Sequence, residues 1–251
     1  MERRALIIYC DNTSSGPLPG PSKDNENFVS FLQSNLGGNW GPDEIESLHN
    51  PSKKDVLRIK RSHLDTADYS FVVFSGHGNI NVYADGEEQM LETADGEISI
   101  FDLRTEASRQ TLIVDACRAR EFAQQEPIVK SADLSESLKL GQQTREIFDK
   151  HVQAADQGWS VLFAASENES ARDTFGGAAF LLSLLRAAKH WSEVGDREEY
   201  FPLNLAHEQA TQILRRRYVT DQHPQMIIEK RRRHFPFAVK RSGLRHVKLV
   251  I

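Results

Sequence analysis

Two short runs rich in β-branched and aromatic residues, 69–74 and 111–114, constrain the fold of this chain more than any other feature. They read Tyr-Ser-Phe-Val-Val-Phe and Thr-Leu-Ile-Val. Runs of this composition, without strict alternation of polar and apolar residues, are typical of strands buried on both faces of a parallel sheet. Apolar residues recur at helical spacing elsewhere, as in 28–36 and 203–217. The sequence therefore predicts an α/β fold.

Each of the two runs is followed by a reactive side chain. The first leads into Ser75-Gly-His-Gly78 and the second into Asp115-Ala-Cys117. Open α/β sheets bind ligands beyond the carboxyl ends of their strands, so His77 and Cys117 lie on one rim if the strands are neighbours. A histidine beside a cysteine can remove the thiol proton, and the imidazolium then holds the thiolate at a lowered pKa. This pairing predicts acyl transfer, most simply peptide hydrolysis with Cys117 as nucleophile and His77 as general base.

The two motifs resemble those of the caspase, metacaspase and paracaspase group of cysteine peptidases. Caspases carry Gln-Ala-Cys-[Arg/Gln/Gly]-Gly, with the histidine about fifty residues upstream. Here the separation is 40 positions, Ala-Cys-Arg is kept, and Asp115 and Ala119 replace Gln and the final Gly. In caspases the Gln accompanies a basic S1 pocket that selects aspartate, whereas in metacaspases an Asp at this position helps to form an acidic one. The resemblance therefore implies a metacaspase-like enzyme that cleaves after Arg or Lys.

The resemblance also implies roles for further residues. Asp24, Ser75 and Asp115 would line S1, and the N–H groups of Gly78 and Cys117 would donate to the oxyanion. No carboxylate is evident that would orient the imidazole, and in this family a backbone carbonyl can serve instead. Two alternatives stay open at this point. Asp24 also suits the first turn of a helix, where capping and the macrodipole favour an acid, and Asp115 could be a structural carboxylate that bonds backbone.

By the same resemblance the fold is a caspase-like α/β/α sandwich with a mostly parallel central sheet. It forms a single domain over 1–251, with a large-subunit-like part at 1–119 and a small-subunit-like part at 158–251. Between them, 120–157 has few large hydrophobic residues and is expected to be an exposed linker with a helix at 131–140. Its basic residues suit cleavage by a protease with an acidic S1. Turn-type pairs at 85–86 and 95–96 predict a small antiparallel hairpin excursion after the histidine.

Composition excludes several classes of function. The net charge of −5 gives no general drive toward nucleic acid, and the basic clusters at 215–217 and 230–234 are interpreted as solvated faces. No stretch approaches the roughly twenty apolar residues of a membrane helix. Cys10 and Cys117 are the only cysteines, which gives no disulfide framework and favours a cytoplasmic protein. Cys10 is expected to be a buried residue of the first strand.

No cofactor or metal site is predicted. The acids at 85–97 lack the spacing of a calcium loop, so calcium dependence is left open. The expected partners are a protein or peptide substrate and an activating protein, and the expected role is an effector protease in cell death or defence, switched on by a partner, linker cleavage or an ion. The alternatives are an Asp-specific caspase-like protease and a catalytically silent interaction module. The presence of both His77 and Cys117 favours an enzyme.

Overall fold

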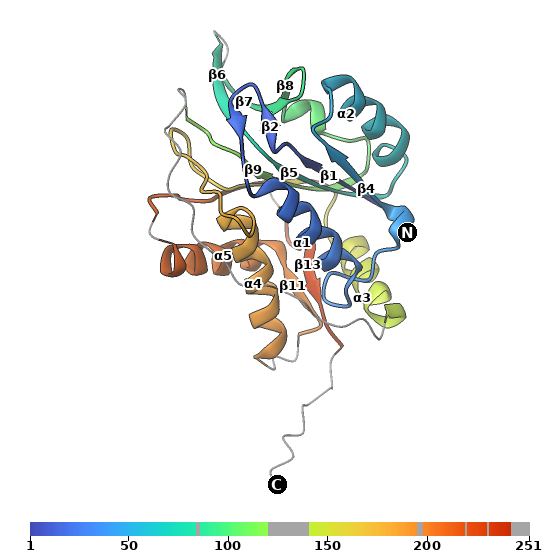
Figure 1. Cartoon of the computed structure of the whole chain (residues 1–251). Coiled ribbons are helices and arrows are strands. Elements are labelled where there is room, and N and C mark those ends of the chain that lie inside the picture. The colour runs from blue at the N-terminus through green and yellow to red at the C-terminus, as the bar shows by residue number, and fades with distance from the viewer. Residues whose placement is uncertain (84–85, 120–140, 195–197, 219, 230, 242–251) are drawn as a thin grey trace.

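The computed structural model describes residues 1–83, 86–119, 141–194, 198–218, 220–229 and 231–241 (Figure 1). The strands are β1 (Arg3–Tyr9), β2 (Asn12–Thr13), β3 (Gly16–Pro17), β4 (Ile45–His49), β5 (Tyr69–Ser75), β6 (Gly78–Tyr83), β7 (Gly86–Thr93), β8 (Gly96–Ser99), β9 (Arg109–Asp115), β10 (Gly158–Phe163), β11 (Tyr200–Pro202), β12 (Gln225–Ile228) and β13 (Pro236–Val239). The α-helices are α1 (Pro21–Gln33), α2 (Lys53–Ile59), α3 (Gly141–Ala154), α4 (Ala179–Glu193) and α5 (Leu203–Arg217). Short 3-10 turns lie at Pro42–Glu44 and Phe101–Leu103, and a π-helical turn at Lys60–Leu64 extends α2.

The centre of the molecule is a six-stranded sheet in the order β12-β10-β9-β5-β1-β4. All of its pairings are parallel except that of β12, which runs antiparallel to β10. Every residue of β5 is buried, as expected of an apolar run without alternation. The α/β class and the mostly parallel sheet are thus confirmed.

Each face of the sheet has its own hydrophobic core. On one face, side chains of β1, β5 and β9 pack with α1, α3, α4 and α5. On the other, the alternate side chains of the same strands pack with α2 and with the strands that follow the histidine. Figure 1 shows the two layers on opposite sides of the sheet. This arrangement is the predicted sandwich.

Among the described residues, three small antiparallel sheets accompany the central one. They are β6-β7-β8, the hairpin β2-β3, and the pair β11-β13. The first is the excursion predicted after His77, and its β7–β8 connection falls at the expected Asp95-Gly96 turn. The helix α4 is buried along most of its length. Within the described ranges, no helix combines the length and apolar content needed to cross a membrane.

The prediction of an exposed linker over 120–157 is wrong for residues 141–154. Residues 141–154 form α3, and Phe148 and Val152 are buried on the sheet face that also holds Trp40. Phe148 and Trp40 meet edge to face, with ring centroids 5.7 Å apart. The few large apolar residues of this segment stabilise a helix because they lie toward the sheet and pack against the core there. Residues 120–140, including the predicted helix at 131–140, lie outside the described residues.

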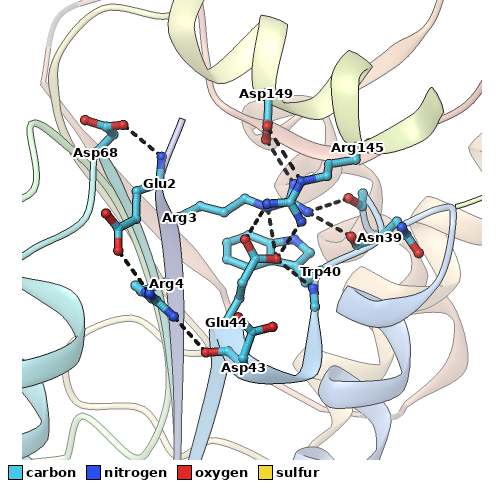
Figure 2. A network of polar contacts seen from close by, with 12 residues as sticks. Glu2, Arg3, Arg4, Asn39, Trp40, Asp43, Glu44, Asp68, Arg145 and Asp149 are labelled. Carbon is cyan, nitrogen blue, oxygen red and sulfur yellow. Dashed lines mark hydrogen bonds and ion pairs between the residues drawn. The ribbon is translucent and has the colours of Figure 1, made fainter. Parts of the chain in front are cut away.

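A buried arginine joins α3 to the first strand (Figure 2). Arg3 is fully buried. Its guanidinium contacts Asp149 at 3.1 Å and Glu44 at 3.6 Å, and lies 4.5 Å from the centroid of the Trp40 ring. Arg145 of α3 binds the same Glu44 carboxylate through both of its terminal nitrogens. Two arginines and two acids therefore connect β1, α3 and the turn before β4.

The backbone completes the coordination of this arginine. The Nη2 group of Arg3 donates to the carbonyl oxygens of Gly38 and Asn39 at 2.8 and 2.9 Å. Burial lowers the pKa of Arg3 to about 10, and the nearby charges of Asp149 and Glu44 oppose that shift. A guanidinium tolerates such a site because several of its fixed N–H donors find acceptors.

Candidate active site

The strands that precede the two candidate catalytic residues are neighbours in the sheet. β5 and β9 pair in parallel with Ser75 opposite Asp115, and the Gly76 N–H donates to the Asp115 carbonyl at 3.1 Å. His77 and Cys117 each follow two positions after this pair. The fold thus brings both to the same edge of the sheet, as the sequence analysis required.

Gly78 brings the histidine segment against the cysteine segment. A Cβ at this position would lie 2.7 Å from the carbonyl oxygen of Met90 and 2.9 Å from the Cβ of Ala116. Contacts this short are not tolerated, so only glycine allows the approach. The N–H groups of Gly78 and Cys117, the predicted oxyanion donors, therefore belong to two segments in direct contact.

A backbone carbonyl faces the imidazole of His77. Nε2 lies 3.2 Å from the carbonyl oxygen of Gly16, at the tip of the β2-β3 hairpin. A carbonyl can only accept, so Nε2 carries the proton in this contact and Nδ1 is left as a proton acceptor. Gly16 has φ +107°, a backbone conformation that favours glycine. The family resemblance implies that a backbone carbonyl can orient this imidazole, and Gly16 is the residue whose carbonyl faces it.

The Cys117 thiol is half-buried, and its pKa is raised above the ordinary value. Burial is the main cause, and the negative charges of Asp115 and Asp173 add to it. Hydrogen bonds with the Ala171 backbone and the Ser170 side chain oppose the shift, with Sγ 4.0 Å from the Ala171 carbonyl oxygen. The pKa of the Cys117 thiol is therefore raised, where the sequence led us to expect a lowered one, because the thiol is half-buried and lies near two acids.

Asp24 and Ser75 lie in contact beneath this edge. The Ser75 Oγ donates to Asp24 Oδ2 at 2.6 Å, and the Ala178 N–H donates to Oδ1 at 2.9 Å. Asp24 is 1% exposed, and burial raises its pKa well above the ordinary value. It stands in the first turn of α1, but no side chain caps that helix. The carboxylate instead binds across to β5 and to the start of α4.

Asp115 is 4% exposed, and its Oδ2 has no hydrogen-bond partner. Burial raises its pKa well above the ordinary value, and the charges of Asp24 and Asp173 raise it further. The N–H of Leu181 favours the ionised form. The structural interpretation of Asp115 as a backbone-bonding carboxylate thus leaves one buried oxygen unexplained, and such an atom destabilises a fold unless something else uses it.

A third carboxylate, Asp173, was missed by the sequence analysis. It follows β10 in a polar loop and accepts N–H groups from Gly20 at 2.9 Å and from Thr174 at 2.8 Å. Burial raises its pKa to about 6. We call Asp24, Asp115 and Asp173 the carboxylate cluster. In the portion of the chain that the structure describes, no three His, Cys, Asp or Glu side chains are placed to hold a metal ion.

Comparison with known proteins agrees with this architecture. The caspase-domain family model matches residues 2–236. Among solved structures, the chain is similar to caspase-1 from Spodoptera frugiperda, with a TM-score of 0.61 and 14% identity over 97% of this chain and 92% of that chain. No curated protein matches the sequence significantly. With the family model spanning nearly its whole length, the chain belongs to the caspase-domain family of cysteine peptidases.

Proposed function

We propose that the protein is an endopeptidase that cleaves after Arg or Lys, with Cys117 as nucleophile and His77 as general base. The observation that carries the proposal is the buried Asp115 Oδ2, which has no partner and belongs to a cluster of three carboxylates close to Cys117. A guanidinium or ammonium group would supply both the positive charge and the donors that this oxygen lacks. Ser75, Asp24, Asp115 and Asp173 would then form S1.

The proposed reaction uses the two residues in two stages, acylation and hydrolysis. Nδ1 of His77 accepts the thiol proton as Sγ of Cys117 attacks the scissile carbonyl carbon, and the carbonyl electron pair moves to oxygen. The N–H groups of Gly78 and Cys117 donate to that oxyanion. Collapse expels the amine, which takes the proton from His77 and leaves a thioester. Water then attacks the thioester with His77 again as base, which releases the acid and restores the thiol.

A P1 cation would do more than anchor the substrate. The negative charges of Asp115 and Asp173 disfavour the thiolate of Cys117. An Arg or Lys side chain bound between these carboxylates offsets their charge. Occupation of S1 therefore favours ionisation of the nucleophile at the moment when a peptide bond is in place.

The two alternatives fit the site less well. An Asp-specific protease would bring a P1 carboxylate against three carboxylates, an arrangement that electrostatics rejects. A silent interaction module has no use for the Gly16 carbonyl that orients His77 toward proton transfer. Activation by a partner, by linker cleavage or by calcium, an effector role in cell death or defence, and a cytoplasmic location belong to the same proposal.

Fluorogenic peptides with Arg, Lys or Asp at P1 test this function directly. The purified protein should release the fluorophore after Arg and Lys, and Cys117→Ala should abolish release while it keeps the thermal unfolding midpoint. The assay is run with and without calcium. Cleavage after Asp would overturn the S1 assignment, and equal release by Cys117→Ala would overturn the nucleophile.

The carboxylate cluster also predicts a pH dependence. The pKa of Asp173 is raised to about 6, and only the ionised carboxylate pairs with a cation. Selection of P1 Arg should therefore strengthen as pH rises through about 6. The measurement is the ratio of kcat/KM for a P1-Arg peptide to that for its neutral P1-citrulline analogue between pH 5 and 8.5. Effects of pH on the catalytic residues apply to both peptides and cancel in this ratio, so a constant ratio would contradict the prediction.

A further inference from the structure

Glu92, at the end of β7, is an acid in an unexpected place. Its segment contains many acids without the spacing of a calcium loop, and such acids are usually solvated, yet Glu92 is only 3% exposed. A buried carboxylate costs stability unless donors or a positive charge surround it. The groups around the Glu92 carboxylate therefore indicate what stabilises it in this buried position.

The donors to Glu92 come from one short segment. Thr13 Oγ1 donates to Oε2 at 2.5 Å, the Ser15 N–H donates to Oε2 at 3.3 Å, and the Ser15 hydroxyl donates to Oε1. The Ser14 hydroxyl is 3.4 Å from Oε2. Burial alone would raise the pKa of Glu92, but these hydrogen bonds, together with the nearby His77, lower it. The carboxylate is thus held ionised by the β2-β3 hairpin.

The same hairpin presents the carbonyl that faces the catalytic base. Gly16 follows Ser15 directly, and its oxygen lies 3.2 Å from Nε2 of His77. The Glu92 N–H donates to the His77 carbonyl at 3.0 Å. A closed ring of contacts results, which runs from the His77 backbone through Glu92 and the hairpin to the His77 imidazole. The backbone N–H of Glu92 holds the backbone of His77. The side chain of Glu92 holds the hairpin whose Gly16 carbonyl faces the His77 imidazole.

We propose that Glu92 is a positioning residue, which holds the 13–16 hairpin so that the Gly16 carbonyl keeps the proton of His77 on Nε2 and leaves Nδ1 free for the Cys117 proton. The inference rests on the proposed role of His77 as base. The hairpin is two residues per strand, paired by Asn12 with Pro17 and Thr13 with Gly16. So short a hairpin is not stable alone, and the Glu92 carboxylate supplies the contacts it lacks.

The test compares Glu92→Gln with Glu88→Gln. Glu88 lies on the same strand and also accepts a hydrogen bond from a serine hydroxyl, that of Ser99, but it takes no part in the ring around His77. The first readout is the tautomer of neutral His77 in long-range proton–nitrogen spectra of histidine-labelled protein. The wild type and Glu88→Gln should show Nε2–H, and Glu92→Gln should show a mixture of both tautomers.

The second readout is the rate at which iodoacetamide alkylates Cys117, followed by mass spectrometry of its peptide. A general base contributes about 100-fold or more when it is positioned, so partial loss of position should slow alkylation roughly 10-fold in Glu92→Gln and leave Glu88→Gln within about twofold. Neither readout requires peptide cleavage. No peptide cleavage together with a changed His77 tautomer in Glu92→Gln would count against the proposed function, whereas an unchanged tautomer would count against this inference.

Removal of the donors provides a second route to the same result. The double variant Thr13→Ala/Ser15→Ala keeps Glu92 and should also yield mixed tautomers, which keeps the test decisive if Glu92→Gln does not fold. Combined with Glu92→Gln it should add little further loss, because residues that act through the same bonds are not additive. An unchanged His77 tautomer and alkylation rate in both variants would overturn the proposal.

Discussion

Replacing Asp115 with asparagine is expected to lower kcat/KM for a P1-Arg peptide by about 30-fold to 4,000-fold. Loss of one partner from a buried charge pair costs about 2–5 kcal/mol, and each 1.4 kcal/mol is about a tenfold change. Asparagine keeps the size of the side chain and removes the charge that would face the guanidinium. The measurement is kcat/KM for matched P1-Arg and P1-citrulline peptides, and only the first should fall steeply.

Asp102→Asn is the matched control for this substitution. Asp102 pairs with Lys53 at 3.1 Å on the surface, away from the carboxylate cluster, so its loss should leave both peptides unchanged. The alkylation rate of Cys117 should not fall in Asp115→Asn, because the nucleophile and its base stay in place. If both peptides lose activity equally, Asp115 supports the fold of the site and does not select P1.

The same substitution should stabilise the protein. The pKa of Asp115 is raised in the folded state, so the folded protein binds more protons than the unfolded chain and its stability falls as pH rises above the ordinary aspartate range. Asparagine removes this cost. A higher unfolding midpoint at pH 7.5, together with a smaller gain at pH 4.5, would show that the site sacrifices stability for cation binding.

The second large effect is expected at Arg3. Replacement by methionine removes the guanidinium from between Asp149 and Glu44, and breaking a buried ion pair in this way costs about 3–5 kcal/mol. For a chain of this size the unfolding midpoint should fall by roughly 10 °C. Methionine fills much of the volume of the arginine side chain but leaves Asp149 and Glu44 without this partner. Differential scanning calorimetry measures the resulting drop in the unfolding midpoint.

Arg4→Met is the internal control, since Arg4 occupies the next position of the same strand. Its Nη2 contacts Glu2 at 3.0 Å, and both side chains are partly exposed (Figure 2). Exposed pairs contribute about 0–1 kcal/mol, so this variant should unfold near the wild-type midpoint. An equal drop in the unfolding midpoint for Arg3→Met and Arg4→Met would mean that burial does not decide how much these ion pairs contribute to stability.

Much of the architecture follows from local sequence. The apolar residues of β5 and β9 predict buried parallel strands, and the Ser52 hydroxyl caps α2 as its position before Lys53 indicates, accepting from the Asp55 N–H at 3.1 Å. The segment 141–154 was assigned to the linker because its few apolar residues give a weak local signal. Phe148 becomes a core residue only when Trp40, over a hundred positions earlier, lies against it.

The site divides along the same line. His77 and Cys117 can be proposed from the sequence alone, because each lies two positions after a strand that local composition predicts. Asp173 cannot be recognised in this way, since only the fold brings this loop residue close to Asp115 and Gly20. Glu92 and Arg3 show the reverse error, because charged residues in polar or terminal segments suggest exposure and these two are buried. Their partners are distant in sequence, and local patterns do not contain them.

The strands β9 and β10 are neighbours in the central sheet although they are far apart in the sequence. The two strands lie on opposite sides of residues 120–140, yet they are direct neighbours from Arg109 opposite Gly158 to Val114 opposite Phe163. Arg3 likewise reaches across to α3. A single cut between residues 120 and 140 would therefore break one peptide bond and none of these contacts. The two products would stay together as a complex, held by the β9–β10 pairing and by the Arg3–Asp149 ion pair.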